Sequence, residues 1–228
     1  MPEFQLHDVS LSIPQAALGE RVRLALEGGY FEQDEARAMR GYFKPDDRLL
    51  DLGSGTGYIA TIAGRIAGGE AVTGVEALPQ MVEVAKANLL RNDVHGAQIL
   101  WGAAVSSAHQ GEQVRFAARR QFWASSIVQD GQAERSGHMD VPALRMDALL
   151  RRSRATIISC DIEGGELDLF EMDLPQQVRL IILEIHPKQY GDAGTGRVFS
   201  ALARNDMVYS ARRSVGATVV FRRIAASD

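Results

Sequence analysis

The chain has 228 residues, of which 46% are hydrophobic and 24% charged, and its formal net charge at pH 7 is -4. This composition excludes a disordered or fibrous chain and favours one domain, which we expect to span residues 1–228. The arginine pairs are dispersed, so nucleic acid is not an expected partner. Cys160 is the single cysteine, which excludes an intrachain disulfide and fits a reducing compartment. No basic start precedes an apolar run and no stretch reaches the roughly 20 apolar residues of a membrane span, so we expect a cytoplasmic chain with no membrane partner.

Residues 1–47 are expected to precede a central sheet. Weak alternation up to Ser12 indicates an extra strand, and apolar residues three and four apart predict helices over residues 15–27 and 31–42. Such leading helices either cover a ligand or form a purely structural lid over the first strand of the sheet. The sequence leaves both interpretations open.

Residues 49–60 read LLDLGSGTGYIA, a short apolar strand that runs into alternating glycines and then a helical pattern. Gly53, Gly55 and Gly57 allow a sharp turn against which a ligand can lie, and the helix beginning near Gly57 directs free N–H groups toward it. The dinucleotide fingerprint requires its third glycine where Tyr58 stands, so the spacing disfavours NAD. Asp51 occupies instead the position of the acid in the loop that binds S-adenosylmethionine in methyltransferases, and its charge favours the ammonium and sulfonium of that donor.

A second carboxylate follows the glycine loop at a suggestive distance. A helix over residues 58–67 leads into a strand over residues 70–77, in which Glu76 stands about 20 residues past the glycines, where a carboxylate accepts hydrogen bonds from ribose hydroxyls. The other interpretation of Glu76 is a solvated charge at a strand end. Pro79 then begins a helix that ends near Asn92. A third strand over residues 98–105 carries Ala103 and Ala104, which either leave room for an adenine ring or merely pack.

The alternation of helix and strand is interrupted over residues 111–146, which we interpret as an insertion or long loop. Short strands are expected over residues 114–117, 125–128 and 141–146, around a polar segment. A stretch of this kind is usually a binding loop or a lid. Phe122 and Trp123 either stack on a ligand or belong to local core.

The alternation resumes at Thr156 with TIISCDIEGGELDLF, a strand that ends at Asp161 and Glu163, followed by a helix expected to begin near Glu166. VRLIILEIHP then predicts a buried strand ending at Glu184 and His186, which share a face by the period of two. A helix over residues 195–205 and a terminal hairpin of strands 207–211 and 218–223 complete the predicted order.

Several of these motifs together resemble the FkbM-type methyltransferases: LLDLGSGTGY, the helix ending ANLLRN, GAAV, VPALRMDALL, CDIEGGE and LEIHP, which cover residues 48–187. The most specific block is DIEGGE, because alternating glycines occur in many families. The resemblance implies the α/β class I methyltransferase fold, a Rossmann-like doubly wound seven-stranded sheet with an antiparallel last strand, formed here by residues 48–228. It also implies methyl transfer from S-adenosylmethionine to a hydroxyl of a sugar or other small natural product. Family members often differ at four positions, which marks a divergent member: Ser54, Thr56, Ala77 and Ser159.

In such a sheet the fourth strand lies beside the first, so Asp51, Asp161 and Glu184 are expected in one crevice at the carboxyl ends of the strands. The donor is assigned to Asp51, Gly53, Ser54, Gly55, Gly57, Tyr58, Glu76, Ala77, Ala103, Ala104 and Asp161. Asp161, Glu163, Glu184 and His186 are assigned to catalysis, with His186 as the base because the ordinary pKa of histidine suits that role.

Three other functions remain alternatives, and no metal ligand is assigned. The strand-end acids and the histidine form a donor set that also suits a divalent cation, as in metal-dependent O-methyltransferases. An NAD-binding oxidoreductase requires Tyr58 in place of a glycine, and a non-catalytic binding module leaves the acidic strand ends without a role.

Overall fold

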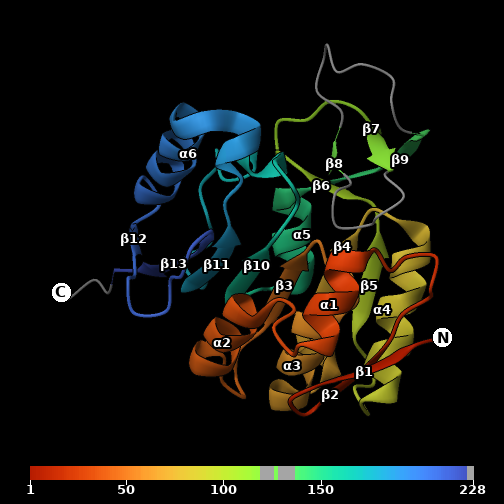
Figure 1. The fold of residues 1–228 in the computed structure, drawn as a ribbon. Coiled ribbons are helices and arrows are strands. Elements are labelled where there is room, and N and C mark those ends of the chain that lie inside the picture. Colours follow the sequence, from red (N-terminus) through yellow and green to blue (C-terminus); the bar gives the residue numbers. More distant parts are fainter. Residues whose placement is uncertain (119–125, 128–136, 225–228) are drawn as a thin grey trace.

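The structure is a computed structural model that describes residues 1–118, 126–127 and 137–224. Its central sheet contains seven strands (Figure 1), namely β3 (Leu49–Leu52), β4 (Val72–Glu76), β5 (Gln98–Trp101), β10 (Ile157–Cys160), β11 (Leu180–Glu184), β12 (Met207–Tyr209) and β13 (Thr218–Arg223). Their order is β12-β13-β11-β10-β3-β4-β5. The strands from β11 to β5 are parallel, whereas β13 pairs antiparallel with both β11 and β12. The predicted doubly wound sheet with an antiparallel last strand is therefore confirmed.

Alternate side chains along the strands enter two apolar cores. Leu49 and Ile157 face the first core, which is covered by α1 (Glu20–Glu27), α2 (Gln33–Tyr42), α3 (Tyr58–Ala67) and α4 (Pro79–Arg91). Leu50 and Ile158 face the second, which is covered by α5 (Met146–Ser153) and α6 (Pro187–Ala203). Both faces are buried, as the continuous apolar strands require. Among the described residues, no helix has the length and apolar character needed to cross a bilayer.

The N-terminal segment forms a hairpin rather than the single predicted strand. β1 (Glu3–Leu6) pairs antiparallel with β2 (Val9–Ser12), and the turn includes His7 at φ 54. Asn88 of α4 fixes the hairpin, because its Oδ1 accepts a hydrogen bond from Ser12 N at 2.7 Å while its Nδ2 donates to Thr56 O at 2.9 Å. The fully buried amide of Asn88 thus connects the hairpin to the glycine loop.

Helix α1 begins at Glu20, later than the predicted start at residue 15.

The predicted third strand is broken at Gly102, so the expectation of one strand over residues 98–105 is wrong. Gly102 has φ +152, and a Cβ there would lie 2.7 Å from Pro142 O. After the break, β6 (Ala103–Val105) leaves the central sheet and pairs parallel with β9 (Gly137–Arg145). The insertion supplies the rest of this second sheet, in which β7 (Gln113–Ala118) pairs antiparallel with β9 and with β8 (Ser126–Ile127). Phe122 and Trp123 lie outside the described residues.

Two helix predictions near the C-terminal half need correction. The helix expected near Glu166 is a single 3₁₀ turn, η3 (Gly165–Asp168), because Glu166 turns inward and is fully buried. Helix α6 begins at Pro187, earlier than residue 195, and is interrupted at Gly191, where φ is 69 and ψ is -179. Glycines at 191, 194 and 196 weaken helix propensity, which explains why the sequence pattern missed the first turns.

The loops that follow β3 and β10 meet at a glycine. Gly53 has φ +84, and a Cβ at this position would lie only 1.9 Å from the carbonyl oxygen of Asp161. Asp161 N also donates to Leu52 O at 2.9 Å, and Gly53 N donates to Val75 O at 2.9 Å. The ends of β3, β4 and β10 are therefore held together by backbone contacts that admit no side chain at residue 53.

This contact generates a prediction with a matched control. Gly68 has nearly the same backbone angle, φ +83, but nothing lies within 4 Å of the position that a Cβ would occupy there. With ψ at 150, Gly68 lies in a region that glycine alone adopts readily, so Gly68→Ala should lower the free energy of unfolding by the backbone penalty alone, about 1–3 kcal/mol. Gly53→Ala adds a collision with backbone and should lose about 1–3 kcal/mol more. Urea denaturation of both variants measures the difference, and equal losses would contradict the close approach.

Candidate active site

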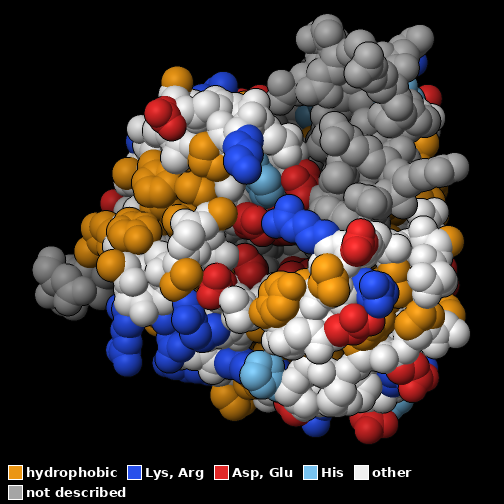
Figure 2. Space-filling view, in the orientation of Figure 1, with side chains coloured by type: hydrophobic (Ala, Val, Ile, Leu, Met, Phe, Trp, Pro, Cys, Tyr) orange, Lys and Arg blue, Asp and Glu red, His pale blue; other side chains and the backbone are white. Residues whose placement is uncertain are grey.

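A cavity of about 780 Å³ opens at the carboxyl ends of β3, β4, β10 and β11. Residues of α1, α2, β7, α6 and the turn before β13 also line it. Figure 2 shows a hollow in the middle of this face, in which acidic side chains gather. Ten predicted site residues line the cavity: Gly53, Gly55, Glu76, Ala77, Ala103, Ala104, Asp161, Glu163, Glu184 and His186.

Glu76 closes one wall of the cavity beside the glycine loop. Its Oε2 accepts a hydrogen bond from Gly55 N at 2.9 Å, and its Oε1 accepts one from Leu78 N at 2.8 Å. Burial raises the pKa of this carboxyl, and the backbone hydrogen bonds oppose that rise. Each carboxylate oxygen has a further lone pair, so Glu76 is fixed in place and still able to accept hydrogen bonds from a ligand.

Four residues assigned to the donor do not line the cavity. Asp51 is 3% exposed, and Ser54 donates through Oγ to the Asp51 carbonyl oxygen at 3.2 Å. Gly57 begins α3 at φ 79 and packs against Ala85 of α4. Tyr58 is 1% exposed, with its ring centroid 6.4 Å from that of Phe31. These residues are buried outside the cavity and support the conformation of the glycine loop.

Small side chains and an aromatic ring also line the cavity. Ala77 follows β4, whereas Ala103 and Ala104 follow the break at Gly102 and are held by the second sheet. Phe116 of β7 lines the same cavity and comes from the insertion. The insertion thus contributes a wall, at a residue that the sequence interpretation did not select.

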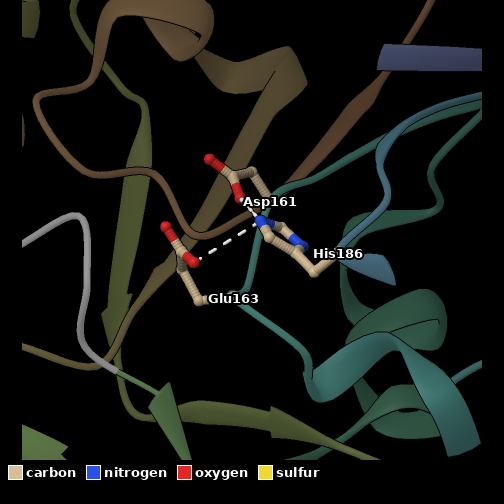
Figure 3. A group of neighbouring side chains, drawn as sticks. All are labelled: Asp161, Glu163 and His186. Atoms are coloured by element: carbon tan, nitrogen blue, oxygen red, sulfur yellow. Dashed lines mark ion pairs between the residues drawn. The ribbon is translucent and has the colours of Figure 1, made fainter. Parts of the chain in front are cut away.

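Asp161, Glu163 and His186 converge from two neighbouring strand ends (Figure 3). His186 Nε2 lies 3.5 Å from Asp161 Oδ1 and 3.5 Å from Glu163 Oε2. The other ring nitrogen, Nδ1, lies 3.0 Å from Oε1 of the fully buried Glu166. Gln189 donates through Nε2 to Glu163 Oε2 at 3.1 Å. The imidazole is therefore surrounded by three carboxylates whose positions are set by the loop after β10.

This environment changes the protonation of His186. Burial disfavours the charged imidazolium, but the Glu166 hydrogen bond and the charges of Glu166, Asp161 and Glu163 outweigh it and raise the pKa to about 9. The imidazole is consequently protonated at neutral pH in the ligand-free chain. The argument from an ordinary histidine pKa is therefore wrong, and His186 accepts a proton only after its own has been displaced.

Further carboxylates face the same space. Desolvation and the nearby charge of Glu184 raise the pKa of Asp161 well above its usual range. Desolvation and Glu35 raise the pKa of Glu184, and desolvation with Glu35, Asp161, Asp51 and Glu184 raises that of Glu32. The shifts share one cause, since several carboxylates occupy a poorly solvated cavity in which acidic side chains outnumber basic ones among the described lining residues.

Sequence reasoning missed several residues of the cavity that lie outside the sheet. Arg21, Glu32 and Glu35 come from α1, α2 and the segment between them. Glu35 accepts a hydrogen bond from Thr218 Oγ1 of β13 and shares the buried face of α2 with Met39. The position of Glu35 on the apolar face of a predicted helix was the sequence feature that could have identified it as a site residue. Glu32 precedes the helix at φ 46, and no such pattern marks it in the sequence.

The strand order, the glycine loop with the acid at the end of β4, and the strand-end acids together define a class I S-adenosylmethionine-dependent methyltransferase domain. The chain matches the Methyltransferase FkbM domain over residues 51–210, more than half of its length. It therefore belongs to the FkbM methyltransferase family, as the motifs predicted, and S-adenosylmethionine is the cofactor of this domain.

Similar proteins extend the comparison. The chain is similar to magnesium protoporphyrin IX methyltransferase from Synechocystis PCC 6803 with bound SAM, at a TM-score of 0.50 and 14% identity, covering 91% of this chain and 86% of that one. This likeness shows the fold. Ribosomal protein L11 methyltransferases match over shorter segments: that of Clostridium perfringens strain SM101 is 35% identical over 66 residues, 29% of this chain, and that of Thermotoga neapolitana strain ATCC 49049 is 41% identical over 56 residues, 25% of this chain. Each match spans 21% of the relative's length.

Buried Asp51 generates a prediction about stability and pH. Desolvation raises its pKa to about 7, the nearby charge of Glu76 adds to the rise, and its Oδ2 has no hydrogen-bond partner among the described residues. Between about pH 4 and 7 the folded chain binds more protons than the unfolded chain at this group, so its contribution to stability falls as pH rises. Asp51→Asn removes that loss.

We therefore compare the free energy of unfolding of Asp51→Asn with that of the wild type at two pH values. The difference, variant minus wild type, should be about 2–3 kcal/mol larger at about pH 8 than at about pH 5. Urea denaturation at both pH values measures this double difference, in which the effects of other titrating groups cancel. A difference independent of pH would show that Asp51 is already ionised in the folded chain at low pH.

Proposed function

We propose that this protein transfers the methyl group of S-adenosylmethionine to a hydroxyl of a small molecule, such as a sugar or another natural product. The observation that carries the proposal is a single cavity with two chemically distinct walls. Gly53, Gly55 and Glu76 line it from the ends of β3 and β4, and we refer to them as the donor wall; Asp161, Glu184 and His186 line it from the ends of β10 and β11, and we refer to them as the catalytic wall. Its volume of about 780 Å³ lies within the 300–1,000 Å³ range typical of small-molecule sites.

The residues present fit the donor. The glycine loop provides bare backbone, Glu76 provides fixed acceptors for ribose hydroxyls, and the carboxylates favour a cationic ligand. When bound, the donor supplies a methyl group on a sulfonium sulfur, whose carbon–sulfur bond breaks as the acceptor oxygen forms the new carbon–oxygen bond. We assign Asp161 to the positive charge of the donor.

The chain contributes alignment and proton transfer. The fixed separation of the two walls orients the acceptor against the donor, which supplies a large part of such a rate enhancement. A hydroxyl must also lose its proton, and we assign this proton to Glu184 or His186, which lie two residues apart at the end of β11. Glu163 orients the imidazole together with Glu166.

The proposal of a small-molecule acceptor is supported by the number of separate elements that line the cavity. Arg21, Glu35 and Lys188 line it from three separate elements, and the segment before β13 lines it from a fourth. The L11 methyltransferases that match share only short segments with the chain, so their protein substrate does not decide the acceptor. A protein acceptor is instead an outcome that a labelling experiment detects.

The test uses methyl-labelled S-adenosylmethionine with the small-molecule and the protein fractions of a cell extract. Label should appear as a methyl ether in the small-molecule fraction. His186→Ala should lower turnover by about 100-fold or more, as expected for loss of proton-transfer catalysis, while leaving donor affinity within about threefold. Glu76→Gln should instead weaken donor affinity by about 10-fold, the value of one hydrogen bond to a charged group. Calorimetry measures both affinities.

The matched control is Glu83→Gln, which removes an exposed carboxylate of α4 paired with Lys86 and should change neither quantity. Label recovered in protein, or on nitrogen, would contradict the proposed acceptor. Equal loss of donor affinity in the His186 and Glu76 variants would contradict the division of the cavity into a donor wall and a catalytic wall.

A further inference from the structure

We propose that Asp161, Glu163 and His186 bind a divalent cation, of the class of Mn²⁺, at the catalytic wall of the cavity. The role of this cation in turnover rests on the proposed function, but its binding does not. One ligand atom from each residue lies within 4.8 Å of the others, and the imidazole nitrogen lies 3.5 Å from each carboxylate oxygen (Figure 3). Cations bound at about 2.1 Å hold neighbouring ligand atoms about 3–3.5 Å apart. The distances to the imidazole already match a coordination shell.

The imidazole is oriented as a ligand. Nδ1 lies 3.0 Å from Glu166 Oε1, and Glu166 is fully buried in η3. A carboxylate that accepts the Nδ1 proton fixes the ring. Once the cation displaces the proton on Nε2, the lone pair of that atom is directed at the cation, an arrangement common around metal-bound histidines. Nε2 is the atom that faces Asp161 and Glu163. Gln189 of α6 donates a hydrogen bond to Glu163 Oε2.

One carboxylate oxygen of the cluster supplies a second observation. Asp161 Oδ1 is a buried atom that has no hydrogen-bond partner among the described residues. Asp161 Oδ1 is also the atom directed at His186 Nε2. Buried carboxylate oxygens are normally hydrogen-bonded or bound to a cation, because leaving them unpaired is costly.

The charge around the cluster agrees with a cation. Glu32 lines the cavity from the residue before α2, Glu35 from α2 and Glu184 from β11. Arg21 and Lys188 are the lysine and arginine residues among the described lining residues. The donor carries one net positive charge, which leaves carboxylates uncompensated. Two carboxylates with one imidazole suit Mn²⁺ and similar first-row cations better than Mg²⁺, which prefers oxygen ligands alone.

Such a site changes the assignment of roles. With Nε2 bound to the cation, His186 becomes a ligand, and Glu184 is the remaining proton acceptor at the end of β11. Asp161 then holds the cation instead of the positive charge of the donor. All three ligands line the cavity, so an acceptor oxygen that enters it can complete the coordination shell and lose its proton more readily there. Glu166 is then a positioning residue that acts through His186.

The experiment titrates the full chain with Mn²⁺ alone at neutral pH and follows free Mn²⁺ by electron paramagnetic resonance. The wild type should bind one Mn²⁺ per chain. Glu163→Gln should weaken binding by more than about 10-fold, and Glu166→Gln by about 10–100-fold through loss of ring orientation. Glu171→Gln is the matched control, because this carboxylate of the same loop is paired with Arg197 and Arg204 outside the cluster and should leave affinity unchanged.

Circular dichroism confirms that each variant is folded, and calorimetry with S-adenosylmethionine in the presence of chelator tests the donor site separately. Folded wild type that binds the donor but no Mn²⁺, with or without S-adenosylhomocysteine, would overturn the cation site and leave the proposed function standing. Mn²⁺ binding without donor binding would do the reverse. Equal weakening by Glu171→Gln and Glu163→Gln would show nonspecific binding by surface acids and overturn the site.

Discussion

The contact between Gly53 and the carbonyl oxygen of Asp161 fixes the relative position of the two walls of the site. The donor loop follows β3 and the acidic loop follows β10, and these strands are neighbours in the sheet. Because residue 53 has no side chain, the two loops pack backbone against backbone, and Asp161 N is held by Leu52 O. A methyl transfer depends on the alignment of two ligands, so a rigid connection between the donor wall and the catalytic wall is a direct contribution to catalysis.

Charge is the second constraint on the site. The carboxylates of Asp161, Glu184 and Glu32 share a poorly solvated cavity, and desolvation together with their mutual repulsion raises the pKa of each. His186 responds in the opposite sense and keeps a proton to about pH 9. The ligand-free chain therefore stores unfavourable electrostatic interactions that a cationic ligand relieves. This accounts for a preference for a sulfonium donor and for the proposed divalent cation beside it.

The features predicted correctly from the sequence are those set by local pattern. The glycine spacing, the helix Tyr58–Ala67 and the position of Glu76 at a strand end all follow from short stretches of chain. The features that were missed depend on tertiary contacts. Gly102 breaks a strand because Pro142 and Leu144 approach it, and Glu166 turns inward to reach His186, 20 residues away. The partnership of Glu35 with Thr218 spans 183 residues and has no local signature.

Amide hydrogen exchange with S-adenosylhomocysteine, the demethylated product, tests most directly the claim that these loops form one donor site. Saturating product should slow exchange in the segments that contain Gly53 and Gly55, Glu76 and Ala77, and Ala103 and Ala104. Exchange in the β1–β2 hairpin, which lies outside the cavity, should stay unchanged. Binding of the product without protection of these three segments, or with protection confined to other segments, would contradict this donor site.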